Sequence, residues 1–280
     1  MYVTMAEIAK RAMEGGYGVT APNVYDEFSV TAAISAAEEL NAPVILDVTP
    51  GMAPNGFHHF MKMTIEKARD AKVPVCANLD HGKTFEVCIE ALREGCSSIM
   101  ADRSVLPLEE NIAQVAELAN IAHICGASIE AELGHVGQGV TYAADRDAGM
   151  TNPAEAKEFV EKTKVDLLAI AMGTAHGVYK GTPHLDFDVL AAVRKAIPNT
   201  PLVLHGGSGT GDENLARATR EGIAKVNIFT DLSLAAVAAI RENGFSENMG
   251  VLPVMNIMMK GYKDKLVHYM KLFNMENKAW

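Results

Sequence analysis

Cysteine is scarce in this chain of 280 residues, which has four, and long apolar runs are absent. The cysteines, Cys76, Cys88, Cys96 and Cys125, include no CxxC pair, so a structural zinc knuckle or a redox dithiol is not expected. We expect buried, reduced thiols. No apolar run approaches the ~18 residues that a membrane-spanning helix needs, and the amino terminus lacks the apolar core of a secretion signal. These absences favour a cytoplasmic protein without a membrane partner.

Basic residues are also in the minority, with 25 Lys and Arg against 35 Asp and Glu, for a formal net charge of -10. This balance argues against a nucleic-acid partner, although it permits a local basic pocket for a phosphorylated metabolite. The segment Tyr17–Asn23 lacks a GxGxxG turn, which excludes the usual dinucleotide-binding sheet. No linker-like or low-complexity tract divides the chain.

What the chain does contain is a regular alternation of short apolar runs and longer amphipathic stretches, the pattern of βα units on a parallel sheet. Val30–Leu40, Glu109–His123 and the segment that starts at Asn152–Pro153 are expected helices. Eight units predict a single (β/α)8 TIM barrel over residues 1–280, with a methionine-rich helical extension from about Leu252 for core or subunit contacts. The expected strands are Tyr17–Ala21, Val44–Val48, Val73–Leu79, Ser97–Ala101, Ala127–Ala131, Asp166–Ala171, Pro201–Leu204 and Ala224–Ile228.

Polar side chains follow nearly every expected strand. In a barrel the carboxyl ends of the strands meet at one mouth, where active sites lie. Three histidines, His81, His176 and His205, belong to this set. Three neutral imidazoles with one open position are a typical catalytic zinc site. The strand-end residues are Asn23, Asp47, Thr49, Asp80, His81, Asp102, Glu130, Glu132, the run from Gly173 to Gly177, the run from His205 to Gly209, Asn227, Thr230 and Asp231.

A glycine-rich turn, Gly206–Gly209, follows the seventh strand. Its glycines would let backbone N–H groups approach an anion, and Ser208 adds a hydroxyl donor. Barrels often bind phosphate at the loops after strands seven and eight, and Thr230 is in the second of these loops. We therefore expect a phosphate site there.

Together these segments resemble the class II ketose-bisphosphate aldolases, especially the fructose- and tagatose-bisphosphate group. The resemblance extends from about Ala6 to Ala238. The matching segments are LDHG (Leu79–Gly82), SVLPLEENI (Ser104–Ile112), EAELG (Glu130–Gly134), TNPAEAKEFV (Thr151–Val160), GTAHGVYKG (Gly173–Gly181), LVLHGGSG (Leu202–Gly209) and KVNI (Lys225–Ile228).

The resemblance implies an enzyme that reversibly cleaves a ketose 1-phosphate or ketose 1,6-bisphosphate to dihydroxyacetone phosphate and an aldehyde. It implies a catalytic Zn²⁺ on His81, His176 and His205, with Glu132 and Asp102 near a second divalent or a monovalent cation. Asp80 would be the acid/base at the C4 hydroxyl, and Asn227 would hydrogen-bond the enediolate. A homodimer or homotetramer is implied. The substrate pocket would comprise Asn23, Thr49, Gly177, Lys180, Gly206, Gly207, Ser208, Asn227, Ile228, Phe229 and Thr230.

Three departures from the family pattern affect the substrate. The loop Gly134–Asp147 lacks the usual Glu-Asp, so Asp145, Asp147 or His135 must supply that acid, or the proton step differs. Phe229 occupies a position that is often polar or small. Glu242–Val254 has no Lys or Arg for a second phosphate, which favours a ketose 1-phosphate whose distal end is not a phosphate.

The same sequence admits two other interpretations. Lys225 has the strand parity of Asn227, so it could form a Schiff base in the barrel interior. Three histidines at strand ends would then have no role. A non-catalytic phosphosugar-binding barrel is the second alternative. For the substrate, Arg146, Lys180 or a residue from a neighbouring subunit could still supply the charge that a distal phosphate needs.

Overall fold

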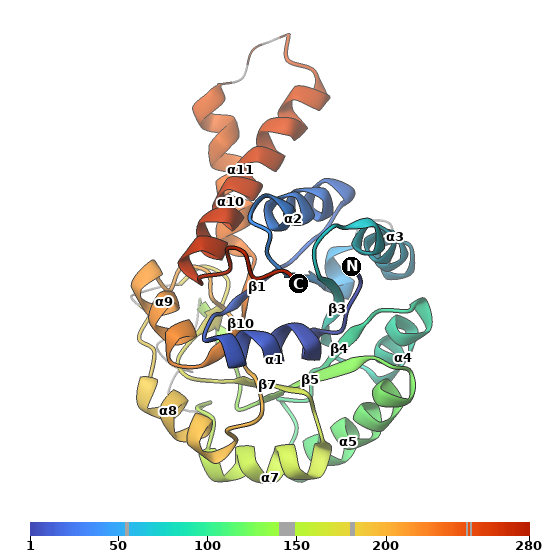
Figure 1. Ribbon diagram of the computed structural model, residues 1–280, viewed down its shortest axis with the longest axis vertical. Coiled ribbons are helices and arrows are strands. Elements are labelled where there is room, and N and C mark those ends of the chain that lie inside the picture. The colour runs from blue at the N-terminus through green and yellow to red at the C-terminus, as the bar shows by residue number, and fades with distance from the viewer. Residues whose placement is uncertain (54–55, 140–148, 180–182, 245, 247) are drawn as a thin grey trace.

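Eight parallel strands form the central sheet of this protein, seen in a computed structural model that describes residues 1–53, 56–139, 149–179, 183–244, 246 and 248–280 (Figure 1). The strands are β1 (Val19–Pro22), β2 (Val44–Val48), β3 (Val75–Gly82), β4 (Ser98–Ala101), β5 (Ser128–Leu133), β7 (Leu167–Ile170), β9 (Leu202–Leu204) and β10 (Ile223–Ile228). Their order in the sheet is β1-β10-β9-β7-β5-β4-β3-β2. Each strand overlaps one of the eight predicted runs.

The two edges of this sheet meet, so the sheet curls into a barrel. Asn23 and Asp47 form a parallel bridge just beyond β1 and at the end of β2. The Val24 N–H donates to the Asp47 carbonyl over 3.0 Å. The predicted (β/α)8 barrel is therefore confirmed, and the carboxyl ends of all eight strands open on one mouth.

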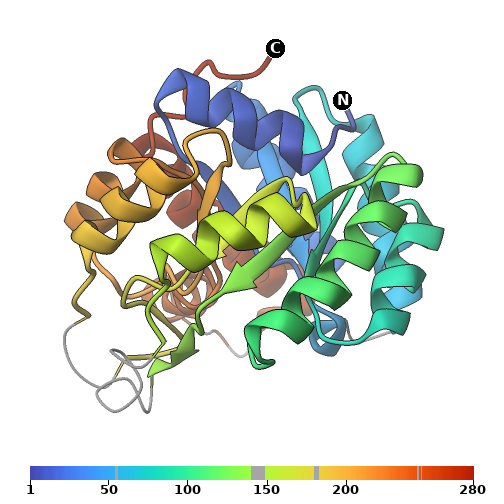
Figure 2. The ribbon, with the colours of Figure 1, turned by 90° about the horizontal axis from the view of Figure 1, so that it is seen from below.

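Helices surround the barrel, and α1 lies across its opposite end (Figures 1 and 2). Local sequence sets several helix starts: Asn152 caps α7 through two backbone N–H groups, and Thr84 caps α4 through the N–H of Val87. The helices are α1 (Met5–Gly15), α2 (Glu27–Glu39), α3 (Phe57–Asp70), α4 (Phe85–Glu94), α5 (Leu108–Ile124), α7 (Pro153–Thr163), α8 (Phe187–Ala196), α9 (Asp212–Arg220), α10 (Thr230–Asn243) and α11 (Val251–Leu272), with a 3₁₀ turn η1 (Pro50–Met52).

The last two helices form an antiparallel pair, here called the arm, whose tip projects away from the barrel (Figure 1). The other end of α11 packs on the barrel, where the Tyr262 hydroxyl donates to the Asn23 carbonyl over 2.9 Å. This contact fixes the loop after β1, which borders the mouth. Across the described ranges, no helix is both long and apolar enough to cross a membrane.

Two features of this fold differ from the sequence predictions. Two short strands, β6 (Gly137–Gln138) and β8 (Ala175–His176), pair beside the mouth, and runs of two residues carry no periodicity that would predict them. All four cysteines are free, but only three are buried. The prediction of burial is wrong for Cys125, because it ends α5 at the solvent-facing turn before β5.

Candidate active site

A cavity of about 710 Å³ opens at the mouth of the barrel. Its size lies within the ~300–1,000 Å³ typical of small-molecule sites. Residues that follow or end each of the eight strands line it, so side chains from the whole length of the chain meet there. This is where the predicted strand-end chemistry comes together.

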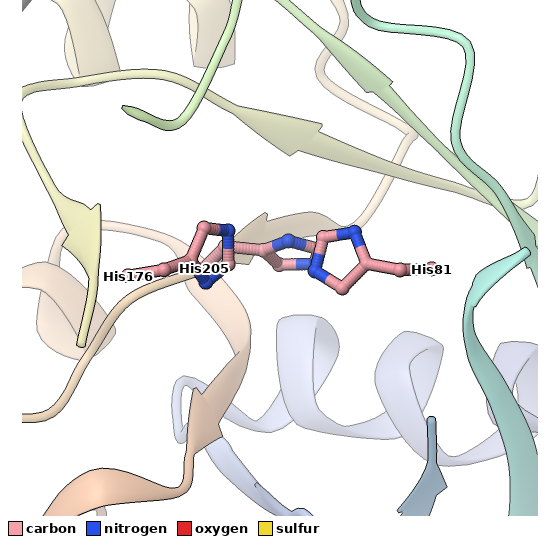
Figure 3. A group of neighbouring side chains, drawn as sticks. All are labelled: His81, His176 and His205. Atoms are coloured by element: carbon pink, nitrogen blue, oxygen red, sulfur yellow. The ribbon is translucent and has the colours of Figure 1, made fainter. Parts of the chain in front are cut away.

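Three histidines converge at the centre of the mouth (Figure 3). His81 ends β3, His176 belongs to β8, and His205 follows β9. The ring centroids are 5.0 Å apart for His81 and His176, 4.9 Å for His81 and His205, and 5.8 Å for His176 and His205. One nitrogen from each ring lies within 4.8 Å of the others, so the three rings surround a common point.

Hydrogen bonds to carboxylates decide which nitrogen of two of these rings is left free. His81 Nδ1 is 2.9 Å from Asp102 Oδ2, which leaves Nε2 for the cavity. His205 Nε2 is 2.8 Å from Glu130 Oε1, which leaves Nδ1. A carboxylate on the second ring nitrogen is the usual way in which proteins orient metal-binding histidines.

Burial and charge make this group suited to a cation. Burial, with the neighbouring histidines, lowers the pKa of His176 to about 4, which favours a neutral ring. Burial alone would also lower the pKa of His205, but Glu130 and Glu132 outweigh it and raise that pKa to about 10. The surrounding carboxylates thus favour positive charge at the centre of the site.

Two buried polar atoms without hydrogen-bond partners also indicate a site for a cation. In the part of the chain that the structure describes, His205 Nδ1 and Glu132 Oε2 are buried without a hydrogen-bond partner. They lie 3.3 Å apart, both facing the histidine cluster. Unpaired buried polar atoms are costly, and a metal ion is one way to satisfy them. The donor set, three imidazoles with nearby carboxylates, fits zinc. His81, Asp102 and Glu132 form a second group of potential ligands.

Asp80 lies beside this cluster, 3% exposed, and accepts three hydrogen bonds. Asn23 Nδ2 and Thr49 Oγ1 donate to Oδ2 over 2.8 and 2.9 Å, and Asn227 Nδ2 donates to Oδ1 over 3.2 Å. Burial raises the pKa of Asp80, but the histidines, Lys225 and Asn23 outweigh burial and hold it well below its ordinary value. The carboxylate is therefore ionised and held in a fixed orientation, as a proton acceptor must be.

The glycine-rich turn after β9 faces the start of α10. Gly206 has φ 64°, and a Cβ there would lie 2.3 Å from the Ala175 carbonyl oxygen, so the turn requires glycine. The Asp231 N–H donates to Ser208 Oγ over 3.1 Å, and Asp231 Oδ2 accepts from the Gly209 N–H over 3.0 Å. α10 begins at Thr230 without a side-chain cap and opens on the cavity, which suits an anion.

The structure brings most of the predicted site residues into one cavity. Two of them, Ile228 and His205, do not line it, because both are fully buried. Ile228 belongs to the hydrophobic core, and its carbonyl accepts from the Asn23 N–H over 3.3 Å. Lys180, Asp145, Arg146 and Asp147 lie outside the described residues. The predicted residues that line the cavity are Asn23, Thr49, Asp80, His81, Asp102, Glu132, His176, Gly177, Gly206, Gly207, Ser208, Asn227, Phe229 and Thr230.

Sequence reasoning missed Lys83 and Ser104, and it named Glu130 at a strand end without giving it a role. Lys83 and Ser104 line the cavity, and the sequence indicated them by position, since Lys83 is three residues after Asp80 and Ser104 is two residues after Asp102. Glu130 is fully buried behind His205. The sequence indicated its direction, because it stands two positions before Glu132 on β5 and therefore faces the same side of that strand.

Lys225, the alternative Schiff-base nucleophile, is fully buried in the barrel interior. Its Nζ lies 2.8 Å from Glu130 Oε2 and 3.6 Å from Asp47 Oδ2. Burial lowers its pKa, but these carboxylates outweigh burial and raise it above the ordinary value. A lysine held protonated is a poor nucleophile, so this geometry opposes the Schiff-base interpretation.

Comparison with known proteins agrees with this geometry. A profile of the family "Fructose-bisphosphate aldolase class-II" matches residues 3–278. The fructose-bisphosphate aldolase of Thermus caldophilus is 39% identical over 267 residues, which cover 86% of this chain and 87% of the relative. YdjI of Escherichia coli (strain K12) is 39% identical over 266 residues, which cover 94% of each chain.

Solved structures give the same result. The crystal structure of the YdjI aldolase from Escherichia coli K12 superimposes with a TM-score of 0.89 at 35% identity, and the match covers 100% of both chains. The fructose-bisphosphate aldolase of Campylobacter jejuni has a TM-score of 0.84 at 23% identity over 99% of this chain and 97% of that one, which supports the fold alone.

Proposed function

The chain belongs to the class II fructose-bisphosphate aldolase family, and from that premise we propose a zinc-dependent aldolase that cleaves a phosphorylated ketose to dihydroxyacetone phosphate and an aldehyde. Membership makes it an enzyme of the carbon–carbon lyase class. The observation that carries the proposal is that three imidazoles converge beside an ionised, triply hydrogen-bonded Asp80, and that two of them, His81 and His176, line the same cavity as Asp80.

His81, His176 and His205 would hold the metal. When bound there, zinc would act as a Lewis acid on the substrate carbonyl. Asp102 and Glu130 would orient two of the imidazoles, through the contacts of 2.9 and 2.8 Å described above. The group of His81, Asp102 and Glu132 is our candidate for a second divalent or a monovalent cation.

Asp80 would start cleavage by taking the proton of the C4 hydroxyl. The C4 oxygen then forms the aldehyde carbonyl, the C3–C4 bond breaks, and its electron pair remains on the dihydroxyacetone phosphate half as an enediolate. Asn227, whose amide also donates to Asp80, would donate a hydrogen bond to that enediolate. Because Asn23 and Thr49 fix the second oxygen of Asp80, the base is oriented before the substrate arrives.

The enediolate must then gain a proton at C3. The loop that follows Glu132 would supply it, since its residues His135 and Val136 line the cavity. His135 is one candidate, while Asp145 and Asp147 of the same loop lie outside the described residues. We keep all three as candidates.

The substrate's C1 phosphate would bind between the two loops after β9 and β10. Gly206, Gly207 and Ser208 line one side of this region, and Thr230 lies at the start of α10 on the other. A helix N-terminus and a glycine turn suit a phosphate, and a hold on it far from the reacting bond orients the substrate.

For the aldehyde half we propose a distal end that is not a phosphate. No described residue of Glu242–Val254 lines the cavity, and that segment has no Lys or Arg. The test is a screen of aldehyde acceptors with dihydroxyacetone phosphate as the donor. If glyceraldehyde 3-phosphate exceeds neutral and carboxylate-bearing aldehydes by orders of magnitude in kcat/KM, the enzyme is an ordinary ketose-bisphosphate aldolase.

A non-catalytic phosphosugar-binding barrel is the alternative, because the loop after β5 lacks the usual acid pair. The hydrogen bonds that orient Asp80 argue against a non-catalytic barrel, since binding alone does not need a base held in a fixed orientation. Release of dihydroxyacetone phosphate from any acceptable ketose phosphate would decide for the enzyme.

We also propose that the chain forms a homodimer or homotetramer through the arm. Leu234 and Val237 on α10 are 57% and 40% exposed, and Val251 and Leu252 on α11 are 69% and 65% exposed. Large exposed apolar side chains gathered on one element are typical of subunit contacts. Light scattering should give a multiple of the 30.0 kDa chain, and Leu252→Glu should reduce that mass, whereas a monomeric wild type would contradict the proposal.

A further inference from the structure

The order of strands in the barrel sets which loops face each other across the mouth. β9 is third and β3 is seventh in the ring of eight, so they are four places apart and lie on opposite sides. β10 and β4, second and sixth, are opposed in the same way. A ketose whose phosphate lies at the loops after β9 and β10 therefore extends toward the loops after β3 and β4.

Lys83 stands in the loop after β3, on that far side. Of the lysines and arginines within the described ranges, it alone lines the cavity. Its ammonium has no ion pair or hydrogen bond with any described residue. The nearby Asp102 is already engaged by His81 Nδ1 and Ser104 Oγ, each 2.9 Å away. The charge of Lys83 is thus free to meet a ligand.

Two polar groups beside Lys83 line the same wall, Ser104 after β4 and His135 after β5. Ser104 Oγ donates its proton to Asp102 and lies 3.4 Å from His135 Nδ1. The far wall therefore combines one unpaired cation with a serine hydroxyl and an imidazole. A lysine of this kind recognises an anion as a point charge.

We propose that Lys83 is a specificity-determining residue that binds an anionic group at the distal end of the aldehyde half. The inference rests on the proposed aldolase function. Lysine contributes a single positive charge, and the wall that it belongs to also contains Asp102. A phosphate near neutral pH carries about two negative charges, whereas a carboxylate carries one. The charge balance therefore favours a carboxylate, so that the substrate class is a ketose 1-phosphate that ends in a carboxylate.

The test uses the zinc-loaded full chain, dihydroxyacetone phosphate, and sets of acceptors with equal carbon number: a neutral aldose, its terminal carboxylate and its terminal phosphate. In wild type the carboxylate should give the highest kcat/KM. Lys83→Met should lower that value by about 10- to 100-fold, as expected for one charge-assisted hydrogen bond, while the neutral acceptor changes less than about twofold. Lys83→Glu should reverse the preference in favour of the neutral acceptor.

Lys72→Met is the matched control, because this exposed lysine precedes β3 at the opposite end of the barrel. It should leave all three acceptors unchanged. The inference is overturned if Lys83→Met lowers neutral and carboxylate acceptors equally or leaves both unchanged, and a selective loss with the phosphate acceptor would overturn the choice of a carboxylate. A wild type that condenses no acceptor at all would instead refute the proposed function.

Discussion

Glu130 Oε1 lies 2.8 Å from His205 Nε2, with both side chains fully buried, and the other oxygen of Glu130 lies 2.8 Å from Lys225 Nζ. One carboxylate thus joins a proposed zinc ligand to the fully buried ammonium of Lys225. The relationship fixes the ring orientation of His205 and leaves its buried Nδ1 on the side of Glu132, 3.3 Å from Glu132 Oε2. We accordingly propose Glu130 as a positioning residue for the proposed metal site.

Glu130→Gln should weaken zinc binding by about 10- to 100-fold, the usual loss when a partner behind a metal-binding histidine is removed. Competition with a chromogenic chelator measures this affinity directly. Glu86→Gln, an exposed substitution on α4, is the control and should leave it unchanged. Unchanged zinc affinity in Glu130→Gln would remove the positioning role.

His205→Ala should lose most of its bound zinc, because it deletes one of three ligands that no described neighbour can replace from the same position. Elemental analysis of the purified variant gives the zinc-to-protein ratio. His268→Ala, which alters a partly exposed histidine paired with Asp212, should retain the wild-type ratio. Full zinc content in His205→Ala would rule out the three-histidine assignment.

Asp80→Ala should lower kcat by ~10²–10⁴-fold, the range for loss of a general acid–base group, while zinc content stays at the wild-type level. The reason is that Asp80 is proposed to move a proton and is not a proposed ligand. Steady-state cleavage kinetics and elemental analysis on the same sample separate the two effects. Activity within a few-fold of wild type would refute the role of Asp80.

Lys225→Met should destabilise the protein by about 3–5 kcal/mol, because it leaves Glu130 and Asp47 buried without their cation. Urea unfolding at neutral pH measures the change. Treatment of wild type with substrate and borohydride should give no covalent adduct, whereas a chelator should abolish activity. An adduct at Lys225 would restore the Schiff-base interpretation.

The sequence by itself determined the barrel architecture and the end of the barrel at which the candidate site lies. Short apolar runs and helix caps such as Asn152 are local signals, so strands and several helix starts followed from them. Parallel strands in a barrel end at one mouth, so the placement of His81, His176 and His205 at strand ends was enough to predict that they meet.

Only the tertiary structure decided how these groups act on one another. Which nitrogen of His81 and His205 stays free depends on carboxylates 21 and 75 positions away in sequence. Lys225 has the parity of an interior nucleophile, yet its partners Glu130 and Asp47 hold it protonated. Lys83 is a candidate for binding the distal end of the substrate because it lies across the mouth from the glycine-rich turn, and that position follows from the order of the strands in the barrel. Strand period and polarity are properties of neighbouring residues, whereas distances between side chains on different strands are fixed only when the barrel closes.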